Sequence, residues 1–501
     1  MSVSMSETEA KYDAPAGAGL PDLRGVPQVA DISGPDDLEL EAEYYDTGDL
    51  RLIRAGVTLR RRRGGDDSGW HLKLPAGRDT RREIRRALNG ERVPAELAGL
   101  VRVHTRGEPL RPVVLMTTRR RRLTLLDGSG RSLAEVSADD VSAQALGAAA
   151  ALSRWQEVEV ELTGGDRRLL RAVDEVLRGS GLRRAARPAK LQRALESRLP
   201  AADRRPALAP SSPAGQVVLA YLRDQAAALK SLDPMVRRDE PDAVHQMRVA
   251  TRRLRATLRS FGAVLRGEDI PRLAADLKWL GAVLGEARDA EVLPGHLRSG
   301  LRGIPPELRI GPVGARVQGH FAPVRAAART QVLAALDSDR YFSLLDDLDT
   351  LIAAPPFTAA AAGAAAAVLP AAARRARRQA RRRMRRAWLA TPGQPRDAAL
   401  HQARKAVRRA RYAGEAMAPA LGPRARRFAR RMKRVQSVLG EHQDGVIARE
   451  VTRKLGITAH LAGENAFSYG VLYERDACRA GALQERAGRA WARAARPRWR
   501  R

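Results

Sequence analysis

Two segments of the chain carry the same arrangement of histidine and arginine. The pattern His-x-x-Arg-x-x-x-Arg-Arg-x-Arg begins at His245 and begins again at His401. Arginine is suited to bidentate contacts with phosphate, and histidine changes its charge near neutral pH. The two segments are therefore candidates for binding a phosphate-rich anion.

On a helix, each pattern would form a basic stripe backed by an apolar one. In the first copy, Met247, Leu254 and Leu258 fall opposite the histidine and the arginines. A single arginine-rich helix usually presents nothing more than a solvated face. Two copies in the same register predict instead two helices whose stripes face each other and form a basic channel.

The similarity between the two copies continues beyond the histidine patterns. The segment 278–289, KWLGAVLGEARD, resembles 433–444, KRVQSVLGEHQD. The two pairs of segments are offset by nearly the same amount, 401 − 245 = 156 and 433 − 278 = 155. Self-similarity at a long, fixed spacing indicates a duplicated structural unit.

Charged side chains also alternate along predicted strands near the N-terminus, where every second residue shares one face. One row consists of Glu7, Glu9 and Lys11, and a second acidic row consists of Glu157, Glu159 and Glu161. The cations on the strands between them are Arg60, Arg62, Lys73 and Arg85. Carboxylates are suited to Mg²⁺ or Mn²⁺, and Arg and Lys to phosphate. Metal-assisted attack of water on a triphosphate is the chemistry that such a set can perform. Taken singly, each row is also typical of the solvated face of an antiparallel sheet.

The amino-acid composition limits the classes of partner that the protein is expected to bind. The formal net charge is +33, which predicts a polyanionic partner such as inorganic polyphosphate, nucleic acid or an acidic membrane surface. Aromatic residues make up only 4% of the chain, which disfavours stacking of single-stranded bases. Cys478 is the only cysteine, so an intramolecular disulfide is excluded and a reducing cytoplasm fits. No signal peptide and no run of about 18 apolar residues is visible.

Periodicity divides the chain into two parts. Strand signals extend to about Leu162, and helical periodicity follows Asp166. We expect a first domain at 1–199, a Pro- and Ala-rich linker at 200–213, and an all-helical domain at 214–495 with repeats at about 214–350 and 360–495. The basic run from Arg374 to Arg386 precedes the second repeat, and we expect it to extend the channel.

The first domain resembles the CYTH domain of the triphosphate tunnel metalloenzymes. The resemblance is carried by the motif Glu7-x-Glu9-x-Lys11, by Gly69-Trp-His-Leu-Lys73 and by Glu157-x-Glu159-x-Glu161. It implies an eight-stranded antiparallel barrel whose tunnel binds a triphosphate with Mg²⁺ or Mn²⁺. It further implies that the catalytic residues are Glu7, Glu9 and Lys11. The implied metal ligands are Glu7, Glu9, Glu157, Glu159 and Glu161. The implied phosphate-binding cations are Lys11, Arg60, Arg62, Lys73, Arg85 and Lys190. One arginine of the run from Arg119 to Arg122 would also face the tunnel, and both alternation registers present arginine there.

The helical domain resembles the CHAD domain, a conserved-histidine helical domain. The two histidine helices and the paired Val-Leu-Gly-Glu segments carry this resemblance. It implies a pair of helical bundles that bind inorganic polyphosphate. The expected polyphosphate-binding residues are His245, Arg248, Arg252, Arg253, Arg255, Arg259, Lys278, His401, Arg404, Lys405, Arg408, Arg409, Arg411 and Lys433.

The leading hypothesis is an α+β multidomain protein that hydrolyses inorganic triphosphate in the barrel and binds polyphosphate on its helices, in the cytoplasm and at polyphosphate granules. Thiamine triphosphate, a nucleoside triphosphate and the cyclisation of ATP are alternatives within the enzyme class. A polyphosphate-binding scaffold without catalysis and a basic nucleic-acid-binding protein are alternatives outside it. We expect no membrane partner, and contact with nucleic acid to be nonspecific.

Overall fold

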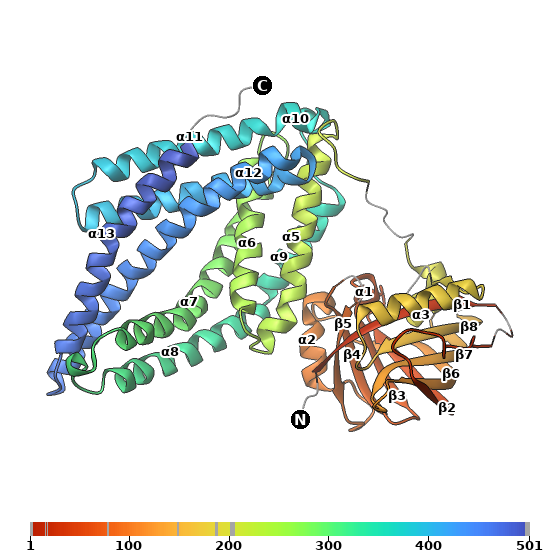
Figure 1. Ribbon diagram of the computed structural model, residues 1–501. Helices are drawn as coiled ribbons and strands as arrows, with labels where there is room; N and C mark the ends of the chain where they lie inside the picture. The colour runs from red at the N-terminus through yellow and green to blue at the C-terminus, as the bar shows by residue number, and fades with distance from the viewer. Residues whose placement is uncertain are drawn as a thin grey trace. The chain divides into compact units, whose positions relative to one another are not determined.

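The structure is a computed structural model that describes residues 4–15, 17, 19–77, 80–147, 150–185, 189–200 and 206–495, without the side chains of 4–7. The chain forms two compact units, residues 1–204 and 205–501 (Figure 1). None of the helices among the described residues is both long enough and apolar enough to span a membrane.

The first unit is a closed antiparallel barrel. Its eight strands are β1 (Ser4–Ala14), β2 (Asp31–Asp46), β3 (Thr58–Arg63), β4 (Gly69–Pro75), β5 (Thr80–Arg86), β6 (Arg111–Leu126), β7 (Ser132–Ala145) and β8 (Ala151–Leu162). They are ordered β5-β4-β3-β2-β6-β7-β8-β1, and pairing of β1 with β5 closes the ring. A short strand, β9 (Arg183–Arg184), adds to β1. The predicted eight-stranded barrel is thus confirmed.

Helices cover the outside of the barrel because alternate strand residues present apolar side chains there. Helix α3 (Arg167–Gly179) begins at Asp166, whose side chain accepts hydrogen bonds from the N–H groups of Arg168 and Leu169. It packs on Tyr12, Val136 and Val160 of three neighbouring strands. The short α1 (Arg51–Arg54) and α2 (Ala95–Thr105) supply apolar residues to a second cluster with β3, β4 and β5. Apolar side chains of the strands therefore point mainly outward, toward the helices, and polar side chains point into the barrel interior.

A short helix, α4 (Lys190–Ala194), follows these elements and closes part of the barrel interior. Leu191 belongs to the same apolar cluster as Val141 and Trp155 of the barrel wall. This packing places the first residue of the helix, Lys190, in the lining of the tunnel, where it is 8% exposed.

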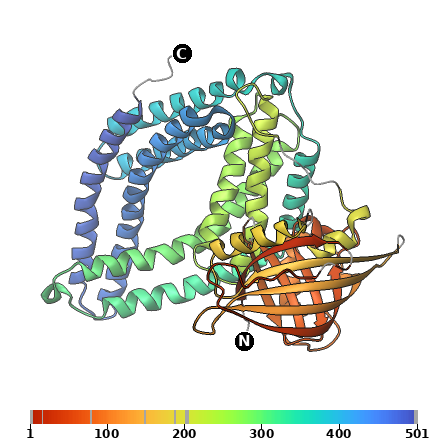
Figure 2. The ribbon, with the colours of Figure 1, turned by 45° about the vertical axis from the view of Figure 1, so that its right-hand side comes forward.

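The second unit is entirely helical. Its main helices are α5 (Ala214–Arg237), α6 (Ala243–Ser260), α7 (Ile270–Arg302), α8 (Val313–Leu336), α9 (Asp339–Ala353), α10 (Ala365–Val368), α11 (Pro370–Leu389), α12 (Gln394–Leu461) and α13 (Phe467–Ala495). The long α12 is interrupted at Gly422, where φ is 58° and ψ is −137°. A left-handed φ is readily adopted by glycine, so the chain turns there and α12 acts as two helices. Figure 2 shows α11 and α13 running beside the two parts of α12.

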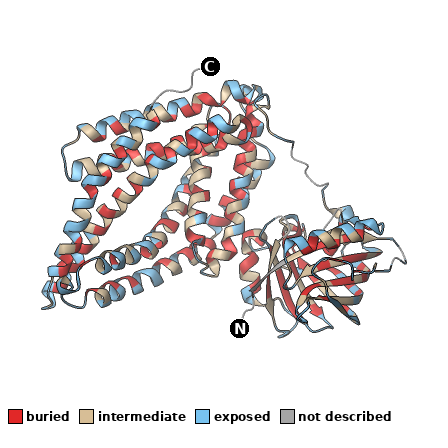
Figure 3. Cartoon of the chain, in the orientation of Figure 1, coloured by how far each residue is buried: buried red, intermediate tan, exposed pale blue. Residues whose placement is uncertain are grey.

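The break at Gly422 makes the repeat visible in three dimensions. Helices α6 and α7 carry the first copies of the repeated segments, and the two parts of α12 carry the second copies. Helix α5 precedes the first pair and α11 precedes the second, while α8 and α13 follow them. Buried residues lie along one side of each helix and exposed residues along the other (Figure 3). The predicted all-helical, duplicated domain is confirmed.

Candidate functional site

The barrel encloses a tunnel of about 410 Å³. Most of the residues predicted from the sequence for triphosphate and metal line it, namely Glu9, Lys11, Arg60, Arg62, Lys73, Arg85, Glu159, Glu161 and Lys190. The backbone of Glu7 lies in β1 opposite Arg81, and its side chain lies outside the described part of the structure. The tunnel therefore brings together residues from five strands and from α4.

Three carboxylates lie side by side on one wall of the tunnel. The strand register places Glu9 of β1 directly opposite Glu161 of β8, and Glu161 directly opposite Glu135 of β7. Burial raises the pKa of Glu161, and the nearby carboxylates Glu159 and Glu9 raise it further. Like charges paired across strands are destabilising unless something compensates them. The set Glu9, Glu161 and Glu135 thus has the oxygen donors that fit a divalent cation, and Glu9 is in addition paired with Lys11 at 3.2 Å and with Arg81 at 3.7 Å.

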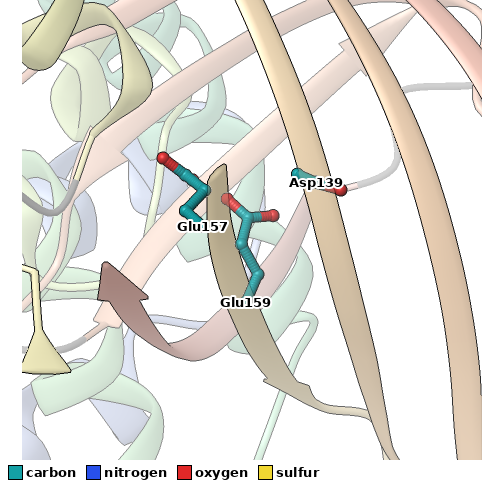
Figure 4. Close-up of side chains that lie close together, drawn as sticks. All are labelled: Asp139, Glu157 and Glu159. Atoms are coloured by element: carbon teal, nitrogen blue, oxygen red, sulfur yellow. The ribbon is translucent and has the colours of Figure 1, made fainter. Parts of the chain in front are cut away.

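A second acidic group, Asp139, Glu157 and Glu159, lies on the neighbouring strands β7 and β8 (Figure 4). One carboxylate oxygen from each residue lies within 4.8 Å of the others. The ammonium group of Lys190 occupies this position, 2.8 Å from Asp139, 2.7 Å from Glu157 and 2.5 Å from Glu159. Although burial alone would lower it, these carboxylates raise the pKa of Lys190. The structure therefore pairs Glu157 and Glu159, predicted as metal ligands, with a protein cation.

Two further cations complete this buried network. Lys11 contacts Glu159 and lies 3.2 Å from Glu9, so it links the network to the carboxylate row. Arg120 donates hydrogen bonds to Asp139 and Glu159 at 2.8 Å and 2.6 Å. Burial would raise the pKa of Glu159, but Lys11, Lys190 and Arg120 hold it well below its usual value. At neutral pH the network is a set of matched opposite charges.

The structure also resolves the register of the arginine run in β6. Arg120 and Arg122 line the tunnel, whereas the side chains of Arg119 and Arg121 are 82% and 63% exposed. Both alternation registers of the sequence presented arginine, so only the pairing of β6 with β2 and β7 decides which pair points inward.

The cations predicted to hold phosphate differ in how firmly they are paired. Arg60 lies 3.4 Å from the hydroxyl of Tyr44, and no ion pair joins it to a carboxylate among the described residues. Arg62 pairs with Asp67 at 2.8 Å, while burial and the charge of Arg60 lower the pKa of Arg62 to about 10. Arg60 is the cation best placed to gain from a bound phosphate, because its buried Nε has no hydrogen-bond partner.

Lys73 and Arg85 meet at one carboxylate, Glu83. Lys73 lies 3.8 Å from Glu83, and Arg85 donates a hydrogen bond to it. His71 lies behind this carboxylate, with Nδ1 2.8 Å from Glu83 and Nε2 2.8 Å from the carbonyl oxygen of Asp67. Burial lowers the pKa of His71. His71 therefore orients Glu83, a role that no spacing in the sequence predicted.

In the helical unit, four repeated arginines lie close enough for their charges to interact. We call Arg248 and Arg252 of α6 and Arg404 and Arg408 of α12 the arginine quartet. Burial, together with Arg408, Arg248 and Arg404, lowers the pKa of Arg252 to about 9. Burial also lowers the pKa of Arg248, and the charge of Arg404 lowers it further, while Asp289, 3.5 Å away, acts in the opposite direction. The two predicted stripes thus face each other, which is the arrangement expected of a polyanion-binding surface.

Two glycines in the repeated Leu-Gly-Glu segments make room for this quartet. A Cβ atom at Gly285 would lie 3.1 Å from Nη2 of Arg248, and one at Gly440 would lie 3.3 Å from Nη2 of Arg404. These are tight contacts, so each glycine allows one arginine to lie against its helix. The equivalence of the two contacts shows that the repeat is preserved at the level of side chains.

The two histidines lie at the edge of the quartet. His401 Nδ1 is 2.7 Å from Oε1 of Gln443. The other ring nitrogen of His401, Nε2, takes no part in this contact. Burial and nearby cations lower the pKa of both histidines, with Arg288 acting on His245 and Lys405 on His401. Both rings are therefore neutral near pH 7, when one nitrogen of each ring donates a hydrogen bond and the other accepts one.

Some of the predicted arginines are paired within the protein. Arg253 and Arg411 converge on Glu415 at 3.1 Å and 2.6 Å, and both lie over the ring of Tyr412. Arg253 thereby joins α6 to α12, whereas the pair of Arg411 and Glu415 lies within α12. Arg409 donates a hydrogen bond of 2.6 Å to Gln379 of α11. The side chains of Arg255 and Lys405 remain close to the quartet, and Arg259, Lys278 and Lys433 are exposed.

Comparison with known domain families gives two matches. Residues 5–189 match the model of the CYTH domain, and residues 220–453 match that of the CHAD domain. The chain is also 36% identical over 487 residues to "Uncharacterized protein Rv2226" of Mycobacterium tuberculosis strain H37Rv. That alignment covers 94% of this chain and 93% of the relative.

Solved structures similar to this chain include two that cover more than half of it. "PptA from Streptomyces chartreusis" is 24% identical with a TM-score of 0.47, and covers 56% of this chain and all of the other. The CHAD domain of the plant Ricinus communis is 26% identical with a TM-score of 0.46, and covers 58% of this chain and 96% of the other.

Proposed function

The chain belongs to the CYTH–CHAD proteins, and from this premise we propose that it hydrolyses a triphosphate in its barrel and binds inorganic polyphosphate on its helices. We propose inorganic triphosphate as the substrate and Mg²⁺ or Mn²⁺ as the metal. The observation that carries the enzymatic part is the tunnel, where a carboxylate row lies on the opposite wall from a row of arginines.

The order of the strands explains how the tunnel would hold its ligands. In a ring of eight strands, β8 with Glu161 lies across from β3 with Arg60 and Arg62, and β7 with Glu135 lies across from β4 with Lys73. A phosphate chain between these walls would meet arginine and lysine on one side and a metal-binding wall on the other. Arg60 would supply charge-assisted hydrogen bonds that the unliganded protein does not make.

Glu9, Glu161 and Glu135, with Glu7 from the same strand as Glu9, would hold the metal. When bound there, the metal would polarise a phosphoryl oxygen and neutralise developing charge. The remaining charge stabilisation would come from side chains of the protein. Lys11 and Arg120 stabilise the negative charge of the leaving phosphate, and Lys190 keeps Asp139, Glu157 and Glu159 neutralised beneath the substrate.

The polyphosphate-binding part of the proposal is supported by the arginine quartet. No ion pair joins Arg252 or Arg408 to a carboxylate in the described part of the helical unit. Because burial and mutual repulsion raise the free energy of these charges, a polyanion that contacts all four would be bound strongly. We propose that the protein acts in the cytoplasm, where this surface would associate it with polyphosphate granules.

The first test is the release of phosphate from inorganic triphosphate with Mg²⁺ or with Mn²⁺, comparing the wild type with Glu9→Gln. We expect metal-dependent release that Glu9→Gln abolishes. Glu39→Gln, which removes an exposed carboxylate on the outer face of β2, serves as the matched control and should behave as wild type. No release from well-folded wild type with either metal would leave the polyphosphate-binding scaffold as the function.

A further inference from the structure

The two repeats of the helical unit differ sharply in charge. Residues 214–285, which span α5, α6 and part of α7, contain 12 Lys and Arg and eight Asp and Glu. The equivalent residues 370–440 contain 22 Lys and Arg and only two acidic residues, Asp397 and Glu415. The arginine quartet contributes equally to both repeats. The excess in the second repeat must therefore lie elsewhere.

Much of this excess lies on the outer side of α11. Its apolar residues Ala376, Ala380 and Met384 face the core, and a stripe of exposed arginines lies on the opposite side of the helix. The stripe consists of Arg374, Arg378, Arg381, Arg382 and Arg385. None of these five forms an ion pair with a carboxylate in the described part of the chain. Like charges at spacings of three and four residues destabilise a helix by a few tenths of a kcal/mol each.

The fold does not require this stripe, because the other repeat lacks it. Helix α5 is the counterpart of α11, and it contacts α9 and the 3-10 turn of Ala359–Ala362 in addition to α6. Val218, Leu222 and Leu229 of α5 are buried. In α11 the side opposite the core is exposed, so no element of the described structure covers it there. The side of α11 that remains open is the side that carries arginine.

The stripe is connected to the arginine quartet through one edge of α11. Arg409 of α12 donates a hydrogen bond to Gln379 of α11. The pKa of Arg409 is lowered by burial and by the charges of Arg259, Arg255 and Arg383, the last of which belongs to α11. Positive charge is thus continuous from the quartet, through Arg409 and Arg383, to the outer side of α11.

From this continuity we propose that the outer side of α11 is a second binding surface, which holds the part of a long phosphate polymer that extends beyond the quartet. The inference rests on the proposed polyphosphate binding and adds a preference for chain length. A helix of 20 residues spans ~30 Å, so the stripe can follow an extended polyanion over many repeats. The outer side of α11 carries no exposed aromatic residue for base stacking, which favours a phosphate polymer over single-stranded nucleic acid.

The test compares the affinities of the full-length protein for short-chain and long-chain polyphosphate over a range of salt concentrations. The variant is Arg378→Gln/Arg382→Gln/Arg385→Gln, since glutamine has nearly the helix propensity of arginine. We expect long-chain affinity to fall by about tenfold or more at low salt, with a salt dependence shallower by about two to three released counterions. Short-chain affinity should change by less than about twofold, because the quartet is intact.

The matched control is Arg298→Gln/Arg302→Gln/Arg453→Gln, which removes three exposed arginines from α7 and α12 of the same unit. If the α11 variant and this control bind long chains equally well, the second surface is overturned while the proposed function stands. If the α11 variant loses duplex DNA binding but keeps its long-chain affinity, the inference is also overturned. Wild type that binds neither polymer would overturn the proposed function itself.

Discussion

The tunnel of the barrel and the arginine quartet of the helical unit are both rich in cations, but they treat positive charge in opposite ways. In the tunnel, Lys190 lies within 2.8 Å of three carboxylates, and burial of the charges is compensated within the protein. In the helical unit, Arg252 has other arginines as its strongest charged neighbours. The charges of the tunnel thus compensate one another within the protein, whereas the arginines of the quartet repel one another, which a bound polyanion of the proposed kind would relieve.

If the two regions have separate functions, variants should separate them completely. We expect Glu9→Gln to lower triphosphate turnover by about 10³-fold, because metal and oxyanion stabilisation are lost together, with unchanged polyphosphate affinity. Arg248→Ala/Arg404→Ala should lower polyphosphate affinity by about 10²-fold, since each removes a charge-assisted contact, with unchanged turnover. Phosphate release and binding titrations on both variants measure this. Loss of both activities in either folded variant would contradict the separation.

The matched charges of the tunnel predict a large effect on stability. Lys190→Met leaves Asp139, Glu157 and Glu159 facing each other without their shared cation. We expect the free energy of unfolding of the barrel to fall by about 3–5 kcal/mol at neutral pH, as for other broken buried ion pairs. Chemical denaturation of the barrel followed by fluorescence measures this effect.

The stability of Lys190→Met should change with pH in the opposite direction to that of the wild type. In the wild type, burial raises the pKa of Asp139, but Lys190 and Arg120 outweigh burial and lower it. This stabilisation is present above the unfolded-state pKa and is lost as the pH falls through the lower folded-state pKa. Without Lys190 the carboxylate pKa values rise, so the variant gains stability relative to wild type on acidification. Parallel pH profiles for the two proteins would exclude this role for Lys190.

The stored repulsion of the quartet predicts a gain in stability on mutation. Arg252→Met removes a half-buried charge that has no carboxylate partner and retains a long side chain. We expect the unliganded helical unit to be stabilised by about 0.5–2 kcal/mol while polyphosphate affinity falls. Thermal unfolding with and without polyphosphate measures both effects. Arg316→Met is the control, because Arg316 pairs with Glu464 at 2.6 Å and its loss should not stabilise the protein.

The smallest effect concerns the glycines beneath the quartet. In Gly285→Ala/Gly440→Ala, the new methyl groups would displace the guanidinium groups of Arg248 and Arg404 by a few tenths of an ångström. We expect polyphosphate affinity to fall by about two- to fivefold, while alanine keeps or raises helix stability. Gly281→Ala, where a Cβ atom would lie 3.6 Å from Thr251, is the control and should bind as wild type.

The sequence predicted local features well because they depend on spacing. The alternation of Glu157, Glu159 and Glu161 placed all three on one face of a strand, and the structure has that face toward the interior. The offset of 156 residues predicted that His245 and His401 occupy equivalent positions. These inferences required only the residue spacing at which side chains share one face of a strand or of a helix.

Contacts between distant segments could not be predicted in this way. The sequence did not predict that Arg253, a candidate for ligand binding, pairs with Glu415, which lies 162 residues away. It likewise grouped the arginines of α11 with the channel, whereas most of them face outward.

The amino-acid sequence by itself thus determined the two domain types, the duplication and the kinds of side chain available for phosphate and metal. Only the tertiary structure decided which charges neutralise one another. Strand register brings Glu9, Glu161 and Glu135 into one row, and the packing of α4 places Lys190 among the remaining carboxylates. The physical reason is that charge pairing acts over a few ångströms, and in this protein it joins residues far apart in the chain, such as Lys11 and Glu159, which are 148 positions apart.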